Sequence, residues 1–184
     1  MNTLYKNIHQ DIIDRCSEGD QKAQFQLYKL YYKPMYSVSL RIVNDIEEAE
    51  DVMQESFLSA FKNIKSYRGE VSFGAWLKKI VVNRSLDVLK KRKVKFEEIN
   101  ERTTEIEDYH MPVKELDAKI LQNAIQQLSD GYRIVLSLYL IEGYDHEEIS
   151  QILGISNSAS RTQLLRAKNK LRELLKGKEV FSYN

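Results

Sequence analysis

Four side chains near the C-terminal end of the chain have the types and the spacing of a surface that reads DNA. They lie one and four residues apart: Arg161, Thr162, Leu165 and Arg166. On a helix this spacing forms one stripe, which a helix set into the major groove would present to base edges and phosphates. Five further basic side chains extend the surface, and their expected role is to contact phosphates: Lys168, Lys170, Arg172, Lys176 and Lys178.

The elements that would position this stripe are two helices and a tight turn. Helices are expected over residues 146–153 and about 157–175, and Gly154 falls where the turn between them needs a positive φ. Apolar residues at three- and four-residue steps supply a small core: Ile149, Ile152, Leu153, Ile155, Leu164, Ala167 and Leu171. The pattern predicts a DNA-reading helix-turn-helix, and a helical hairpin without DNA contact is the alternative interpretation.

The formal net charge of +1 hides a strong segregation of charge along the chain. Residues 1–60 carry 6 basic and 10 acidic side chains, and residues 61–95 carry 11 and 2. Residues 96–130 carry 3 and 9, and residues 131–184 carry 8 and 6. Such alternation indicates separate faces for separate partners, basic ones for a polyanion and acidic ones for something basic. The charged faces of ordinary solvent-exposed helices would also produce this alternation of charge.

Helical spacing of apolar residues dominates the first half of the chain, from Gln21 to about residue 95. Asn44 and Asp45 end one helix and cap the next, whose first turns are rich in acids and which runs to about Ile64. A loop containing a glycine follows at residues 66–72. A further helix is expected over residues 73–91, with lysines and arginines on its outer face.

Composition and length favour an all-α fold of two small helical domains. The chain has 184 residues, 42% of them apolar, with only 2 prolines and 7 glycines. Apolar content falls between Val94 and Met111 while acids accumulate, so residues 96–115 are expected to form a flexible acidic linker. The predicted domains are therefore 1–95 and 116–184, and the second would begin with helices over about 116–128 and 132–141.

Several classes of function are disfavoured by what the sequence lacks. The single Cys16 cannot form an internal disulfide and has no neighbouring metal ligands, which indicates a reduced, cytoplasmic protein without a metal site. No secretion signal or membrane-spanning run is recognisable. His9, His110 and His146 are scattered and no phosphate-binding glycine loop is present, so an enzyme with a cofactor or a small-molecule substrate is not expected.

From about Gln21 onward the chain resembles the extracytoplasmic function sigma factors, the two-domain members of the bacterial sigma family. Three blocks in the same order carry the resemblance. Residues 45–57, DIEEAEDVMQESF, resemble the helix that binds RNA polymerase, and residues 67–84, YRGEVSFGAWLKKIVVNR, resemble the segment for the −10 promoter element. Residues 128–168 resemble the domain that reads the −35 element.

The resemblance implies a role for the first two blocks. Five polar side chains would face the clamp helices of the largest polymerase subunit: Glu47, Glu50, Asp51, Gln54 and Glu55. Nine would bind the −10 DNA, where the loop 63–71 would form a pocket for a flipped base and Tyr67 would stack on it: Asn63, Ser66, Tyr67, Arg68, Trp76, Lys78, Lys79, Asn83 and Arg84. The acids also fit a solvated helix, and a tryptophan beside Phe73 and Ile80 is more often core than DNA contact.

In the second domain the resemblance implies that six residues bind the −35 element: Arg133, Arg161, Thr162, Leu165, Arg166 and Lys168. It also implies contact with the polymerase flap, a separate anti-sigma partner, and a linker that would either imitate RNA in the exit path or serve as a plain tether. Two departures from many relatives, Ser158–Ala159–Ser160 and Gln163, resemble the Bacteroidetes branch and leave the base preference open.

A stand-alone helix-turn-helix regulator is the rival interpretation. Such a regulator would use the same DNA-reading unit, but it would give residues 1–95 no function. These residues contain no receiver-like strand pattern and no ligand-domain signature. The sigma-factor interpretation gives each block a task. The sequence therefore predicts a factor that binds core RNA polymerase and directs promoter recognition, −10 melting and transcription initiation.

Overall fold

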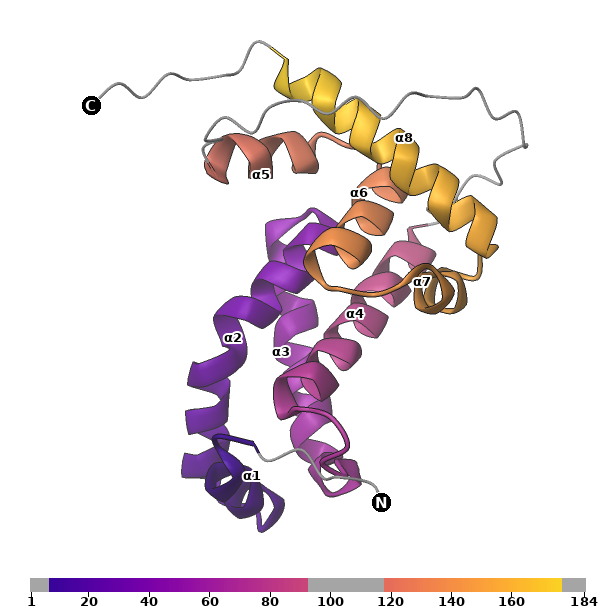
Figure 1. Cartoon of the computed structure of the whole chain (residues 1–184). Helices are drawn as coiled ribbons and strands as arrows, with labels where there is room; N and C mark the ends of the chain where they lie inside the picture. The colour runs from indigo at the N-terminus through magenta and orange to yellow at the C-terminus, as the bar shows by residue number, and fades with distance from the viewer. Residues whose placement is uncertain (1–6, 93–117, 177–184) are drawn as a thin grey trace. The chain divides into compact units, whose positions relative to one another are not determined.

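The structure, a computed structural model, describes residues 7–92 and 118–176 of the chain. Its Cα positions divide into two compact units, Met1–Val94 and Lys95–Asn184 (Figure 1). In the described ranges all regular secondary structure is helical, which confirms the predicted all-α class. The acidic linker predicted over residues 96–115 lies outside the described residues.

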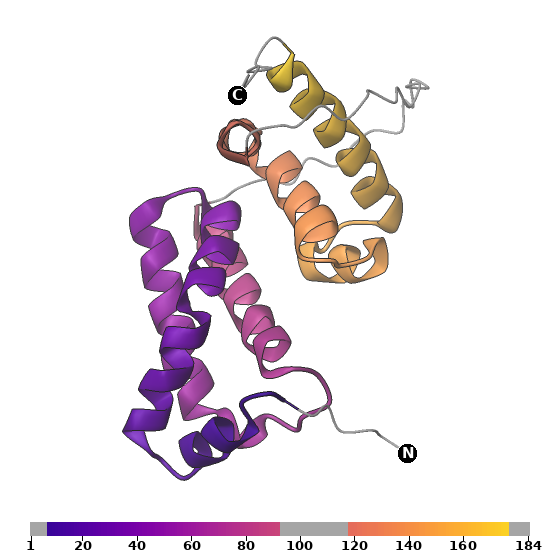
Figure 2. The same ribbon diagram turned by 60° about the vertical axis from the view of Figure 1, so that its left-hand side comes forward.

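The first unit is built on α2 (Gln21–Val43), α3 (Ile46–Lys62) and α4 (Phe73–Lys91), which pack against one another (Figures 1 and 2). Each helix buries one apolar stripe in the shared core, as the helical spacing predicted. The largest contributors that are almost fully buried are Leu27, Ile42, Val43, Phe57, Phe73, Leu77, Val81 and Leu89. The opposite faces of α3 and α4 are thereby turned to solvent, and they carry the candidate functional residues.

Short polar residues set the ends of these helices. Asn44 ends α2 in the left-handed conformation, with φ 56°, and the Asp45 carboxylate then accepts a hydrogen bond from the Glu48 backbone N–H at 3.0 Å. Ser72 caps α4 by accepting a hydrogen bond from the Ala75 backbone N–H at 3.2 Å. The boundary predicted at Asn44–Asp45 and the helix predicted over residues 73–91 are confirmed.

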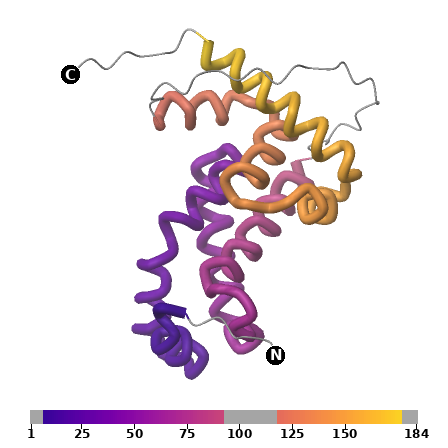
Figure 3. The backbone as a smooth tube through the Cα atoms, viewed as in Figure 1, coloured from indigo at the N-terminus to yellow at the C-terminus, as the bar shows by residue number. Residues whose placement is uncertain are grey.

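Two local features interrupt the regular geometry of α2 and α3. Pro34 lies inside α2, where it cannot donate a backbone hydrogen bond, and the tube through α2 bends midway along its length (Figure 3). α3 ends at Lys62, and a 3₁₀ turn, η1 (Ile64–Ser66), completes the segment that was expected to be helical to about residue 64.

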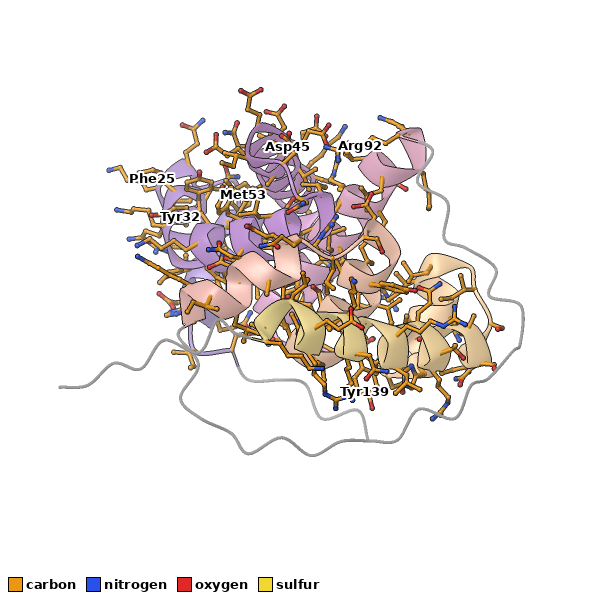
Figure 4. The ribbon with its side chains drawn as sticks, turned by 90° about the horizontal axis from the view of Figure 1, so that it is seen from above. Phe25, Tyr32, Asp45, Met53, Arg92 and Tyr139 are labelled. Atoms are coloured by element: carbon orange, nitrogen blue, oxygen red, sulfur yellow. The ribbon has the colours of Figure 1, made fainter. Side chains whose placement is uncertain are left out.

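Arg92 anchors the end of α4 to the corner between α2 and α3. Its Nη1 donates a hydrogen bond to the Val43 carbonyl oxygen at 2.9 Å, and its guanidinium forms an ion pair with Glu48. Figure 4 labels Arg92 at the end of α4, near Asp45 at the start of α3. Arg92 therefore helps to hold the unit together.

A short helix that the sequence reasoning did not predict, α1 (Gln10–Ser17), packs on α2 and on η1. Ile13 and Cys16, three residues apart, are buried. A helix of this length is marginal by itself, so its stability must come from this packing rather than from local propensity. Burial also raises the pKa of the Cys16 thiol to about 11.

The second unit comprises α5 (Ala118–Gln126), α6 (Asp130–Leu136), α7 (His146–Leu153) and α8 (Asn157–Leu175). The long α8 packs against α5, α6 and α7 and closes the core over Ile134, Leu138 and Ile149. The helix expected over residues 132–141 is confirmed but changes form: α6 ends at Leu136, and a π-helical segment, η2 (Ser137–Ile141), continues it, with the Glu142 N–H donating to the Ser137 carbonyl at 3.0 Å.

Over residues 7–92 and 118–176, no helix is long and apolar enough to cross a membrane. Nor do these residues contain a group of three or more histidine, cysteine or acidic side chains that could hold a metal ion.

Candidate functional site

An acidic stripe runs along the solvent face of α3. The five residues expected to face RNA polymerase are all exposed: Glu47, Glu50, Asp51, Gln54 and Glu55. They recur at intervals of three and four residues, so they follow one side of the helix through two turns. Asp45, Glu47 and Glu48 lie at the N-terminal end, where acids stabilise the helix. The stripe presents a continuous negative surface to any basic partner.

The acidic stripe meets the basic face of α4 in one ion pair. Arg84 Nη1 lies 2.7 Å from Glu55 Oε2, although the two residues were expected to serve different partners. Both side chains are more than one-third exposed, so the pair adds little to stability. Its main effect is to fix where the negative surface ends and the positive surface begins.

The residues expected to bind the −10 element fall into two groups by exposure. Those with exposed side chains are Asn63, Ser66, Arg68, Lys79 and Asn83, and those that are half-buried are Tyr67, Trp76, Lys78 and Arg84. The side chains of Asn63 and Ser66 donate hydrogen bonds to the backbone: Asn63 donates to the Ser59 carbonyl and Ser66 to the Asn63 carbonyl. These two residues therefore shape the turn at η1 as well as facing solvent.

An aromatic cluster holds the loop between η1 and α4. The Tyr67 ring lies edge-on to the Phe73 ring, with centroids 5.7 Å apart, and tilts against the Trp76 ring at 5.4 Å. Phe73 is fully buried, whereas Tyr67 and Trp76 keep part of their surface exposed. Trp76 is thus partly a packing residue, as its helical spacing suggested, and the exposed parts of both rings remain open for base stacking.

A pocket of about 450 Å³ opens beside this loop, within the range of about 300–1,000 Å³ that small-molecule sites occupy. η1 and the loop contribute Ile64, Lys65, Tyr67, Arg68 and Gly69, and α1 contributes Gln10, Ile13, Asp14 and Ser17. Figures 1 and 2 both show α1 at the end of the unit where α4 begins. The lining combines an apolar floor, a tyrosine ring and two cationic side chains at the loop. Aromatic, apolar and cationic groups are among those that proteins use to bind a nucleobase and its phosphate.

A residue that the sequence reasoning missed, Asn7, joins α1 to the loop. Asn7 is only 8% exposed, and its Oδ1 accepts a hydrogen bond from the Phe73 backbone N–H at 2.9 Å. Its Nδ2 donates to Tyr67 Oη at 2.8 Å and to Gln10 Oε1 at 3.0 Å. Asn7 therefore positions both walls of the pocket. No local pattern marks it, because its partners lie far away in the sequence.

The helix-turn-helix predicted near the C-terminal end is confirmed in its geometry. α7 and α8 have the predicted bounds, and Gly154 between them has φ 67°. Asp145 and Glu148 form a reciprocal capping box at the start of α7. On α8, Arg161 is exposed and its Nε donates to Asn157 Oδ1 at 2.9 Å, while Thr162, Leu165, Arg166 and Lys168 are half-exposed.

Of the two departures noted in α8, Gln163 and the last residue of the run Ser158–Ala159–Ser160 are buried, whereas Ser158 is exposed. Ser160 is fully buried, and its Oγ lies 2.9 Å from Nδ1 of the buried His146, whose ring stacks on Tyr139. Burial and the nearby Arg161 lower the pKa of the His146 imidazole. Gln163 is 2% exposed, so it is a core residue and not part of the exposed stripe of α8. Its spacing from Ser160 and Ala167 places all three on the inward face.

Arg133 requires a correction, because the expectation that it contacts the −35 element does not fit its position. It is 1% exposed, and its guanidinium donates to the Leu128 carbonyl at 3.1 Å and pairs with the Asp130 carboxylate. A buried guanidinium with these partners ties the start of α6 to the end of the preceding segment. Its role in this structure is to hold the second unit together.

Replacing Arg133 with methionine is expected to lower the free energy of unfolding of the second unit by about 1–3 kcal/mol, because a buried carbonyl and a carboxylate lose their donor. Urea unfolding followed by circular dichroism measures the change. Arg161→Ala, at an exposed position, is the matched control and should leave the midpoint unchanged. An unaltered midpoint for Arg133→Met, together with weakened promoter binding, would return Arg133 to the DNA-contacting set.

Two family models match this chain in the order of its two units. Residues 27–94 match the model described as Sigma-70 region 2, and residues 118–171 match the model described as Sigma-70, region 4. Together the two matches span more than half of the chain. The acidic stripe, α4 and all nine residues expected to bind the −10 element lie within the first range, and the second range covers α7 and most of α8.

Curated relatives extend the similarity over nearly the whole chain. The ECF RNA polymerase sigma factor SigW of Bacillus subtilis (strain 168) is 29% identical over 177 residues, covering 89% of this chain and 95% of the relative. The ECF RNA polymerase sigma-E factor of Haemophilus influenzae (strain ATCC 51907 / DSM 11121 / KW20 / Rd) is 29% identical over 185 residues, covering 90% and 96%. The chain therefore belongs to the sigma-70 family, as an extracytoplasmic function sigma factor.

Solved structures share its fold. The sigma factor RpoE from Bartonella quintana, crystallised with the anti-sigma factor NepR, matches with a TM-score of 0.56 and 23% identity, covering 84% of this chain and 97% of that chain. CnrH, solved in complex with the cytosolic domain of CnrY, matches with a TM-score of 0.53 and 21% identity, covering 91% and 97%. At these identities the similarity concerns the fold alone.

Proposed function

We propose that this sigma factor divides its work among three surfaces. The acidic stripe on α3 binds the clamp helices of core RNA polymerase. A second contact, between the sigma factor and the polymerase flap, adds to this binding. The loop after η1 and the basic face of α4 bind the −10 element, with an unpaired base held in the pocket beside Tyr67. The exposed face of α8, centred on Arg161 and Arg166, reads the −35 element.

The observation that carries this proposal is the sharp separation of charge on exposed helix faces. α3 turns five polar residues, four of them acidic, to solvent, while the neighbouring α4 turns lysines outward and α8 presents Arg161. Negative potential suits a basic protein partner, and positive potential suits the phosphate backbone of DNA. The pocket adds a chemical reason for strand opening, because its lining suits a base that has left the stack.

Reconstitution with purified core RNA polymerase tests the proposal. The chain plus core enzyme should give run-off transcripts from promoter templates selected from a randomised library, and core enzyme alone should not. The selected promoters should share two separated sequence elements, because two separate units read them.

The rival function, a stand-alone helix-turn-helix regulator, predicts the opposite result. Such a protein would bind a duplex site tightly by itself and would not program core enzyme. It would also leave the acidic stripe and the pocket without a ligand. Tight duplex binding without run-off transcription would therefore overturn the proposal.

Several finer assignments complete the proposal. Residues 1–95 serve as the polymerase-binding and −10-binding domain, residues 96–115 as an acidic linker, and residues 116–184 as the −35-binding domain. The protein works in the cytoplasm, and the phosphodiester chemistry belongs to polymerase. An anti-sigma protein is its regulator, which agrees with the similarity in fold to the sigma factor RpoE, crystallised with the anti-sigma factor NepR. The residue types at Ser158–Ala159–Ser160 and Gln163 are the basis for assigning the chain to a Bacteroidetes-like branch.

A further inference from the structure

Asn7 lies ahead of the part of the chain that the family model covers. The Sigma-70 region 2 match begins at residue 27, so Asn7 and α1 are outside it. Asn7 is nevertheless only 8% exposed, and its side chain bonds Tyr67 and Phe73, which lie 60 and 66 residues further along the chain. A residue outside the matched region is therefore built into the loop to which the −10 element is proposed to bind.

The orientation of the Asn7 amide is set by its backbone partner. The Phe73 N–H can only donate, so the Asn7 atom that it reaches, 2.9 Å away, is the carbonyl oxygen Oδ1. The Nδ2 group then points the other way, where it donates to Tyr67 Oη at 2.8 Å and to Gln10 Oε1 at 3.0 Å. Asn7 therefore joins the start of α4 to the hydroxyl group of the loop tyrosine.

The Tyr67 hydroxyl is held from two sides. It accepts the hydrogen bond from Asn7 and donates its own hydrogen to the Val71 carbonyl at 2.6 Å. The ring itself lies edge-on to Phe73 and tilts against Trp76. Contacts along the ring and bonds at its tip together fix its orientation, while part of its surface stays exposed.

A ring that is already fixed loses less conformational freedom when a base stacks on it. Immobilising one side chain at an interface weakens binding by about two- to tenfold. An aromatic ring that is held in advance at its tip therefore binds an unpaired base more tightly than the same ring held only by its neighbours.

We infer that Asn7 is a positioning residue for promoter opening. It holds the Tyr67 hydroxyl, and through it the ring on which an unpaired base of the −10 element stacks. The segment before residue 27 thereby takes part in stabilising the open strand, although it lies outside the family match. The inference rests on the proposed function, since it requires that a base stack on Tyr67, and it does not depend on which base that is.

The test uses holoenzyme made with the full chain and a promoter whose −10 element is already unpaired. The fluorescent adenine analogue 2-aminopurine, whose emission falls when it stacks, is placed in turn at each unpaired non-template position. Asn7→Leu replaces the amide with an apolar group of similar size. It should bind this template about two- to tenfold more weakly and quench less at the position of the stacked base. Gln21→Leu, the same kind of change at an exposed position, is the matched control and should behave as the wild type.

A double-mutant cycle shows whether Asn7 acts through Tyr67 or only through the fold. Tyr67→Phe keeps the ring but removes the hydroxyl, so it should weaken binding by a similar factor. In the Tyr67→Phe background, Asn7→Leu should have a clearly smaller effect than in the wild type. Because Asn7→Leu loses the bond to Phe73 in both backgrounds, the contribution of that bond cancels from the comparison. Losses that simply multiply would mean that Asn7 acts independently of Tyr67, and would overturn the inference.

Binding to core RNA polymerase, measured for every variant, reports whether the first unit is folded. If Asn7→Leu loses core binding, Tyr67→Phe alone decides the question, because it removes the same hydrogen bond from the other side. Unchanged template binding and quenching by folded Tyr67→Phe would then overturn the inference.

A variant without the ring separates failure of this inference from failure of the proposed function. Tyr67→Ala removes the ring, and the position whose quenching it abolishes identifies the stacked base. If Tyr67→Ala abolishes quenching while Asn7→Leu behaves as the wild type, a base stacks on Tyr67 and the positioning role of Asn7 is refuted. If Tyr67→Ala binds and quenches as the wild type does, no base stacks on this ring, and the inference fails with the proposed function.

Discussion

Replacing Glu50 and Asp51 together with lysine is expected to weaken binding to core RNA polymerase by at least about tenfold, because close charge pairs across interfaces have coupling energies of about 1.5–7 kcal/mol. Both side chains are exposed in the middle of the acidic stripe. Neither lies in the first turn of α3, where Glu47 and Glu48 stabilise the helix end. The change therefore reverses the surface charge with little effect on the fold. Fluorescence anisotropy of labelled chain with core enzyme measures the dissociation constant.

A matched double variant, Asp11→Lys with Glu18→Lys, makes the same change in net charge at exposed positions of the first unit outside the stripe. It should bind core enzyme as the wild type does. The difference between the two variants should also shrink as salt is added, because exposed charges are screened. Equal loss in both variants would mean that net charge alone, and not the α3 surface, governs binding.

Arg161→Ala is expected to reduce transcription that depends on the −35 element by about 10- to 100-fold, the effect of losing one good contact to a base. Arg161 is exposed at the start of α8, and Asn157 holds its Nε at 2.9 Å. The guanidinium is thus already directed before DNA arrives, which reduces the entropy lost on binding. Run-off transcription on templates with and without the −35 element gives the measurement.

Lys170→Ala is the control for this variant. The sequence pattern placed Lys170 in the basic surface of α8, but it lies nine residues beyond Arg161, half a turn out of phase with it, and it pairs with Glu173 at 2.8 Å. Its removal should change −35-dependent transcription little. Core binding should be intact in both variants, and loss of core binding by Arg161→Ala would refute the assignment of α8 to the −35 element.

Local patterns were sufficient to predict most of the helices. The helices at residues 73–91, 146–153 and 157–175 each begin after a capping side chain, Ser72, Asp145 and Ser156, and a glycine follows the second of them. α1 was missed because it is short and depends on packing by Ile13 and Cys16. Its existence matters for the site, since α1 forms one wall of the pocket.

Individual side-chain roles were harder to predict than helices, because burial depends on contacts between segments. Arg133 has the residue type of a DNA contact but is enclosed by its own unit, where it bonds Leu128 and Asp130. Gln163 could have been recognised as inward-facing from its spacing of four residues from the core residue Ala167. Asn7 gave no such signal, since its partners Tyr67 and Phe73 are joined to it only in the folded chain.

The bond between Asn7 and Phe73 closes a loop of the chain across 66 residues. During synthesis, α2 and α3 can pair as soon as they emerge, because their contacts are local in sequence. The pocket can assemble only after the ribosome has released the chain through Phe73, and closing so long a loop costs more entropy than the α2–α3 turn does. Formation of the pocket wall is therefore expected to be a late step in folding, and its opening is expected to be an early step in unfolding.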